Sequence, residues 1–98
     1  MTLRFLSIAK IELDQSFEYY ESQKPKLGES FLQEVRQGVN RIKNHPTAWT
    51  RISKRTRRCL LNKFPFGIIY QIREDEILVI AIAHLHRKPN YWKSRTLI

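Results

Sequence analysis

Residues 60–87 read LLNKFPFGIIYQIREDEILVIAIAHLHR, and this stretch decides the fold. Two apolar runs are rich in β-branched and aromatic side chains: residues 59–61 leading into residues 64–72, and residues 77–84. Each run is interrupted or too short for a typical helix, so both are predicted to be strands. The charged connection 73–76 has the length of a hairpin turn. The stretch therefore predicts an antiparallel strand pair.

The second run is apolar at successive positions, so both of its faces carry apolar side chains. A strand of this kind is usually covered on both sides and lies in the middle of its sheet. Pro65 cannot donate a hydrogen bond to a neighbouring strand and is expected at a strand start, an edge or a bulge. Gly67 favours a bulge at that position.

The first half of the chain predicts a short strand at residues 3–6 followed by two helices. Ser7 is a candidate N-cap for the first helix. Pro25 and Gly28 mark a tight connection, and the second helix should end before His45-Pro46 because proline disfavours helical geometry in the residue before it. Spacings of three and four residues give each helix an apolar stripe. The stripes, Leu13, Phe17, Phe31, Val35, Val39 and Ile42, are expected to pack against Ile69, Leu78, Ile80 and Ile82.

The resulting order β-α-α-β-β-β predicts one α+β domain over residues 1–98, with an antiparallel helix hairpin on a mostly antiparallel sheet. A single cysteine, Cys59, allows no internal disulfide, and it is interpreted as a small core side chain. No apolar run reaches the roughly 18 residues of a membrane span, and the first residues lack the features of a signal peptide. We expect a cytoplasmic protein that does not bind a membrane.

The net charge of +9 is unevenly distributed. Residues 1–50 hold seven Lys/Arg and six Asp/Glu, whereas residues 51–98 hold eleven and three. A basic face attracts nucleic acid or an acidic protein. Alternatively, the cations have no ligand and protect a solvent-exposed edge strand from aggregation, which gives the same composition. Six cations without an intervening acid form the candidate anion-binding cluster: Arg51, Lys54, Arg55, Arg57, Arg58 and Lys63.

A second candidate group follows the last strand and comprises His84, His86, Arg87, Tyr91 and Trp92. Histidine and tyrosine beside arginine could serve acid–base and electrostatic roles in RNA cleavage. Alternatively, His84 is a hydrogen-bonded core residue and Trp92 packs the tail against the sheet. No metal site is expected, because the histidine spacing matches no established ligand pattern. No cofactor motif is present either.

Several motifs together resemble the ParE branch of the RelE/ParE toxin superfamily, over residues 9–95. They are Tyr19-Tyr20, Leu27-Gly28-Glu29 with Phe31 and Glu34-Val35, Pro46, Arg58 with Leu60-Leu61, Phe64-Pro65-Phe66-Gly67-Ile68 with Tyr70, and Ile82-Ala83-His84 with Arg87, Pro89 and Tyr91-Trp92. The resemblance implies a helix hairpin against a curved sheet. It also implies a toxin neutralised by a cognate antitoxin, with which it could form a hetero-oligomer.

The superfamily implies two activities. Its nuclease branch, RelE, cleaves mRNA on the ribosome and places arginine where this chain has Gly67, and lysines where it has Arg58 and Leu60. Its ParE branch acts on DNA gyrase and needs no catalytic residues, which suits this sequence better. If the chain is instead a ribosome-dependent endoribonuclease, the candidate catalytic residues are Arg58, His84, Arg87 and Tyr91. The residues expected to bind the target or the antitoxin are Arg55, Arg57, Arg58, Arg87, Tyr91, Trp92 and Arg95.

Overall fold

A computed structural model describes residues 1–97. Its elements are β1 (Thr2–Phe5), α1 (Ser7–Gln23), α2 (Leu27–Asn44), β2 (Thr50–Arg51), β3 (Arg57–Leu60), β4 (Phe66–Arg73), β5 (Glu76–His84) and the 3-10 helix η1 (Lys93–Leu97). The five strands form one sheet in the order β1-β5-β4-β3-β2. β1 runs parallel to β5, and the other neighbouring pairs are antiparallel. The predicted α+β fold is confirmed.

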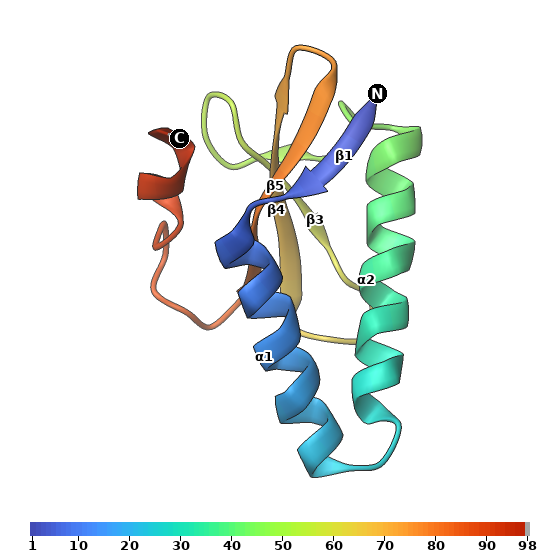
Figure 1. The fold of residues 1–98 in the computed structure, drawn as a ribbon. Helices are drawn as coiled ribbons and strands as arrows, with labels where there is room; N and C mark the ends of the chain where they lie inside the picture. Colours follow the sequence, from blue (N-terminus) through green and yellow to red (C-terminus); the bar gives the residue numbers. More distant parts are fainter. Residues whose placement is uncertain (98) are drawn as a thin grey trace.

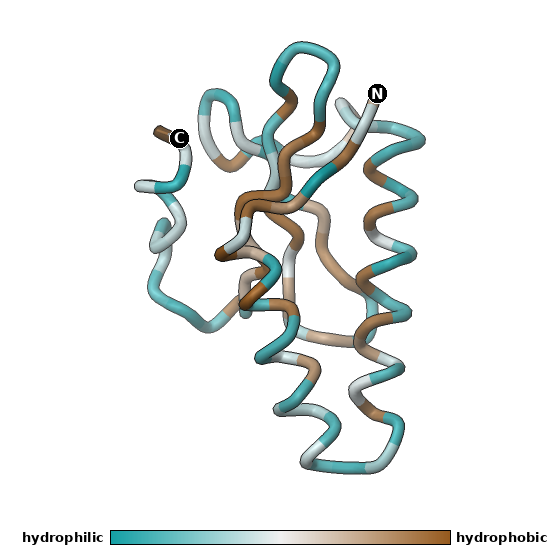
Figure 2. Tube along the Cα trace, viewed as in Figure 1, coloured by the Kyte–Doolittle hydropathy of each residue, from teal (hydrophilic) through white to brown (hydrophobic). Residues whose placement is uncertain are grey.

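Strand β5 lies between β1 and β4 in the sheet and is covered on both faces. All residues from Ile77 to Ala83 are buried, as the continuous apolar run predicted. Helix α1 packs on β5, and α2 packs on β3 and β4. The tail, residues 85–97 after β5, lies on the side of the sheet away from α2 (Figure 1). Figure 2 shows apolar strands in the centre and hydrophilic residues at the α1–α2 and β4–β5 connections.

The predicted bulge at Gly67 is wrong. Gly67 pairs in register with Leu60 and Ala83. A Cβ atom there would lie 2.8 Å from Cγ of Arg58, so glycine leaves space for the Arg58 side chain to cross the strand. The register instead shifts beyond Ile69, where Ile80 of β5 has no partner.

This shift rearranges the two faces of β5. Val79 pairs with Tyr70, and Ile82 pairs with Ile68, two residues earlier on β4. Side chains alternate along a strand, so Val79 and Ile82 lie on the same face although their numbers differ by three. Leu78 therefore lies on the opposite face from Ile82, so the prediction that the helix stripes pack against both residues is wrong.

The helix hairpin forms as predicted but differs in two details. The N-cap of α1 is Leu6 and no side chain caps it, so the predicted cap at Ser7 is wrong. Phe31 is fully buried in the core, whereas Phe17 is only partly buried. The Phe17 ring lies where a Cβ on Gly28 would approach it to 2.8 Å. Phe17 thus contacts α2 at the end of the hairpin, and Gly28 lets the two helices approach closely.

Candidate functional site

A buried carboxylate on α1, Glu12, connects the helix to the tail. The Glu12 side chain is 8% exposed. It accepts hydrogen bonds from Arg87 Nη1 at 3.2 Å and Tyr91 Oη at 2.8 Å, and a two-pronged pair from Arg95 at 2.8 and 3.0 Å. The backbone N–H of Ile82 also donates to it at 3.1 Å. We call Glu12, Arg87, Tyr91 and Arg95 the Glu12 clamp.

Glu12 is not among the candidate residues that the sequence motifs indicated. Glu12 lies three residues after Ala9, so the two residues share a face of α1. An acid among the apolar residues of this face was the sequence signal for a buried charge. The residues that bind Glu12 are more than 70 positions away in the chain. Removing one partner of a buried ion pair strongly destabilises a protein, because the other charge is left buried without compensation. The Glu12 clamp therefore fixes the tail against the sheet and α1.

Tyr91 is packed between charged groups of the Glu12 clamp. Arg87 Cζ lies 3.7 Å from the centroid of its ring, and Arg95 Cζ lies 5.1 Å from it. Burial, and then the hydrogen bond to the Glu12 carboxylate, raise the pKa of Tyr91 to about 12. The phenol consequently remains protonated at neutral pH and acts as a donor to Glu12.

The four candidate catalytic residues do come together. Arg58, His84, Arg87 and Tyr91 line a pocket of about 180 Å³, which we call the tail pocket. Trp92 also lines it and is 5% exposed, so the alternative that Trp92 packs the tail down is confirmed. The residues come from β3, the end of β5 and the tail.

His84 is partly buried at the end of β5. Its ring lies 5.0 Å from that of Phe66, measured between centroids, and its Nδ1 accepts the backbone N–H of His86 at 3.1 Å. This contact engages Nδ1 and leaves Nε2 as the ring nitrogen without a hydrogen bond among residues 1–97. His84 and Arg87 also line a groove beside α1.

We call this second hollow the helix-side groove, which measures about 330 Å³. Its apolar lining includes Tyr19, Tyr20, Phe66 and Ile82. Tyr19 is 60% exposed, and Ile8 and Ile11 on the same helix are also exposed. Exposed apolar side chains near a groove are typical of surfaces that bind another protein.

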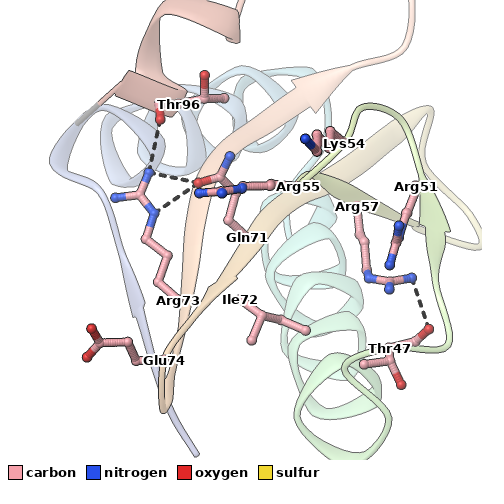
Figure 3. A pocket seen from close by; sticks show the side chains of 10 residues that line it. All are labelled: Thr47, Arg51, Lys54, Arg55, Arg57, Gln71, Ile72, Arg73, Glu74 and Thr96. Atoms are coloured by element: carbon pink, nitrogen blue, oxygen red, sulfur yellow. Dashed lines mark hydrogen bonds between the residues drawn. The ribbon is translucent and has the colours of Figure 1, made fainter.

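The predicted cluster of six cations is divided between several places. Arg51, Lys54, Arg55 and Arg57 line a cleft of about 720 Å³ together with Arg73 (Figure 3). We call it the basic cleft. Arg58 instead lines the tail pocket, and Lys63 is exposed in the loop after β3, where its backbone N–H donates to Glu34.

The predicted binding residues therefore occupy two surfaces. Arg55 and Arg57 belong to the basic cleft, whereas Arg58, Arg87, Tyr91 and Trp92 belong to the tail pocket. Arg95 is part of the tail, and its side chain is only 14% exposed and bound to Glu12. Arg95 and Trp92 offer little surface to a partner, and their main contacts are internal.

Cys59 has the environment of a core residue. It is fully buried, and burial, which outweighs the nearby Arg41 guanidinium, raises the pKa of its thiol. A buried thiol with a raised pKa is a poor nucleophile. This agrees with its interpretation as a small hydrophobic side chain.

A family model described as "ParE toxin of type II toxin-antitoxin system, parDE" matches residues 3–89. The chain belongs to the ParE toxin family. The match includes the basic cleft cations on β2, β3 and β4 and ends before Tyr91, so most of the tail lies outside it. A search of curated proteins found no match.

The fold of this ParE family member is also found among solved structures. A chain of "Chromosomal ParDE TA system from P. aeruginosa" superposes with a TM-score of 0.78, covering 88% of this chain and 97% of that chain. The two sequences are 18% identical, so the likeness concerns the fold alone. Within residues 1–97, no helix is both long and apolar enough to cross a bilayer.

Proposed function

We propose that this ParE family member is a toxin that arrests growth by poisoning DNA gyrase and is neutralised by a cognate antitoxin. The observation that carries the choice of target is the state of the tail pocket. In this pocket, Tyr91 and Arg87 are hydrogen-bonded to the Glu12 carboxylate. In addition, Gly67 and Leu60, at positions where the nuclease branch has basic residues, carry no charge.

A ribonuclease needs cations that are free to stabilise the charge developing on a phosphate, and a group that can accept a proton. Glu12 offsets part of the positive charge in the tail pocket. Tyr91, with a pKa of about 12, is a poor base at neutral pH. A gyrase poison requires surface contacts only, and this chain has two basic surfaces to provide them.

The convergence of Arg58 and His84 with Arg87 and Tyr91 on one pocket favours the second candidate, a ribosome-dependent mRNA endoribonuclease. In that case Arg58 would contact the phosphate, and His84 Nε2 would exchange the proton. The tail pocket has no other imidazole lining it among the described residues, so the nuclease would depend on His84.

One assay separates the two functions. The toxin, freed from its antitoxin, is incubated with gyrase, supercoiled DNA and ATP, and in parallel with ribosomes carrying a labelled message. We expect linear, protein-linked DNA to accumulate while the message stays intact. A message cut at the ribosomal A site with gyrase unaffected would refute the gyrase proposal, and loss of the cleavage in His84→Gln would establish the nuclease.

The antitoxin is proposed to cover the helix-side groove and the adjoining tail pocket. Exposed Tyr19 offers an apolar anchor, and Arg58 and Arg87 at the pocket attract an acidic segment. Such a segment can fold as it binds. Steering by charge predicts that added salt slows its association.

This surface is tested with toxin and antitoxin purified as a complex and separated. Tyr19→Ala should weaken binding at least about tenfold, mainly through faster dissociation. Arg58→Gln should lower the salt dependence of the association rate. Lys43→Gln, an exposed cation near the end of α2, is the matched control. Binding that is unaffected by Tyr19→Ala and Arg58→Gln would place the antitoxin elsewhere.

A further inference from the structure

The basic cleft lies at the end of the sheet where β3 begins and β4 ends. Five cations line it: Arg51, Lys54, Arg55, Arg57 and Arg73. Glu74 is the only acid in its lining. Figure 3 shows Arg51 and Arg57 on one wall, opposite Arg73 near Thr96 on the other, with Gln71 between them. Cations from several chain segments therefore face one space.

One cation of the basic cleft is held in place by neutral groups. The Arg57 guanidinium donates to the backbone oxygens of Thr47 at 3.0 Å and Trp49 at 2.8 Å. These contacts orient the side chain without an opposing carboxylate, so its positive charge remains available. Within residues 1–97, no ion pair engages Arg51, Lys54 or Arg55. Four of the five cations, all except Arg73, therefore have no internal acid as an ion-pair partner within residues 1–97.

The remaining lining indicates what such a site can bind. Among residues 1–97, Ile72 is the only apolar side chain in the lining, and no aromatic ring contributes to it. Protein interfaces usually need aromatic or apolar anchors, and single-stranded nucleic acid is held largely by base stacking on aromatic rings. Neither is provided here. Binding in the basic cleft must therefore rest mainly on charge, and arginine suits phosphate because its fork of donors can bind two oxygens at once.

Among the described residues, the cleft also lacks a free amide side chain, the group that reads adenine edges in the major groove. Its one amide, Gln71, donates to Thr56 Oγ1 at 3.0 Å and accepts from Arg73 at 2.7 Å. We propose that the basic cleft binds the phosphate backbone of duplex DNA. This goes beyond the proposed function, since it requires contact between the isolated toxin and DNA in the absence of gyrase.

The test measures binding of the toxin to a fluorescent duplex of about 20 base pairs by anisotropy, at several salt concentrations. If about four phosphates are neutralised, log K should fall against log salt with a slope of about −3.6. Affinity would then drop about 150-fold between about 50 and about 200 mM salt.

The decisive variant is Arg51→Gln with Arg55→Gln. Both side chains are exposed, so the fold should be retained, which a thermal melt verifies. The slope should change from about −3.6 to about −1.8, so that the affinity drops only about 12-fold over the same salt range. The matched control removes two exposed cations of α2, Arg36→Gln with Lys43→Gln, for the same change in net charge, and should keep the parental slope.

Four results would overturn the proposal. They are no binding at low salt, an equal loss in the control variant, tighter binding of a single strand than of the duplex, and binding of a poly-glutamate peptide as tight as that of DNA. The last result would assign the basic cleft to an acidic protein segment. DNA binding by the isolated toxin with no effect on gyrase would support the cleft while refuting gyrase as the target.

Discussion

The Glu12 clamp and the basic cleft both gather arginines, yet the two groups have different environments. In the clamp, Arg87 and Arg95 share one buried carboxylate. In the cleft, Arg57 binds two backbone oxygens, and Arg51 and Arg55 are exposed. The clamp uses positive charge to hold the tail to the fold, whereas the cleft presents it to the surroundings.

This difference shows that a count of basic residues does not measure the charge available to a partner. Two cations that contribute to the excess in the second half of the sequence are bound to an acid from the first half. The clamp should therefore govern stability, and the cleft should govern binding. Substitutions in the two regions can test that separation.

The largest effect is expected for Glu12→Gln. The amide keeps an oxygen for the N–H of Ile82 but removes the charge that neutralises the largely buried Arg95. Breaking a buried ion pair from one side costs about 3–5 kcal/mol. Urea unfolding measures the change in the free energy of unfolding, with Glu18→Gln, an exposed acid of α1, as the control. Equal stability of both variants would mean that the clamp does not hold the tail.

A smaller effect separates the two arginines of the clamp. Arg95→Gln should cost about 2–3 kcal/mol, because it removes charged hydrogen bonds to Glu12 and a bond to the Ile80 oxygen. The Arg87 side chain is 53% exposed, and pairs at exposed sites contribute about 0–1 kcal/mol. Urea unfolding of Arg87→Gln beside Arg95→Gln measures the difference. The reverse order would contradict the assigned burial.

The clamp should also make stability depend on alkaline pH. The pKa of Tyr91 is raised to about 12, from about 10 in an unfolded chain, so the fold favours the neutral phenol. This contribution is complete below about pH 10 and is lost as pH rises toward 12. Compared with Tyr91→Phe, the parent should lose about 1–2 kcal/mol more between these values.

The comparison with Tyr91→Phe is needed because Tyr70, a buried residue of β4, also has a pKa raised to about 12, chiefly by burial. Tyr70 is present in both proteins, so its contribution cancels. Chemical denaturation at each pH supplies the stabilities. Parallel curves for the two proteins would show that Tyr91 is not protected in the fold.

The smallest effect on stability is expected in the cleft. Arg51→Gln with Arg55→Gln should change the free energy of unfolding by less than about 0.5 kcal/mol, as surface substitutions usually do. Relief of repulsion between like charges could even raise it. Thermal melts at low and high salt measure this. A loss comparable to that of Arg95→Gln would show that the cleft cations are structural, and the contrast between the two regions would disappear.

Much of the architecture could be predicted from local patterns. The run 77–84 identified a central strand because apolar residues at successive positions need cover on both faces. The stripes around Phe31 and Val35 identified a packed helix. Motifs spread along the chain indicated the ParE family, which the family model confirms.

Details that depend on distant neighbours were not accessible in this way. The register shift lies at Ile69 and Tyr70, opposite the unpaired Ile80, and not at the glycine of residue 67. Phe17 belongs to the α1 stripe by spacing, yet its place at the end of the hairpin puts it against Gly28. Both outcomes reflect packing, which local periodicity does not specify.

The sequence by itself determined the helix hairpin, the main strands and their order, the family and the excess of positive charge, because periodicity, turn residues and composition are local properties of the chain. It did not determine β2 or η1. Only the tertiary structure decided which cations are available. Glu12 finds Arg95 across 83 positions, and whether a charge is neutralised depends on distances in space. The same chain therefore carries arginines that stabilise its fold and arginines that remain free to bind a partner.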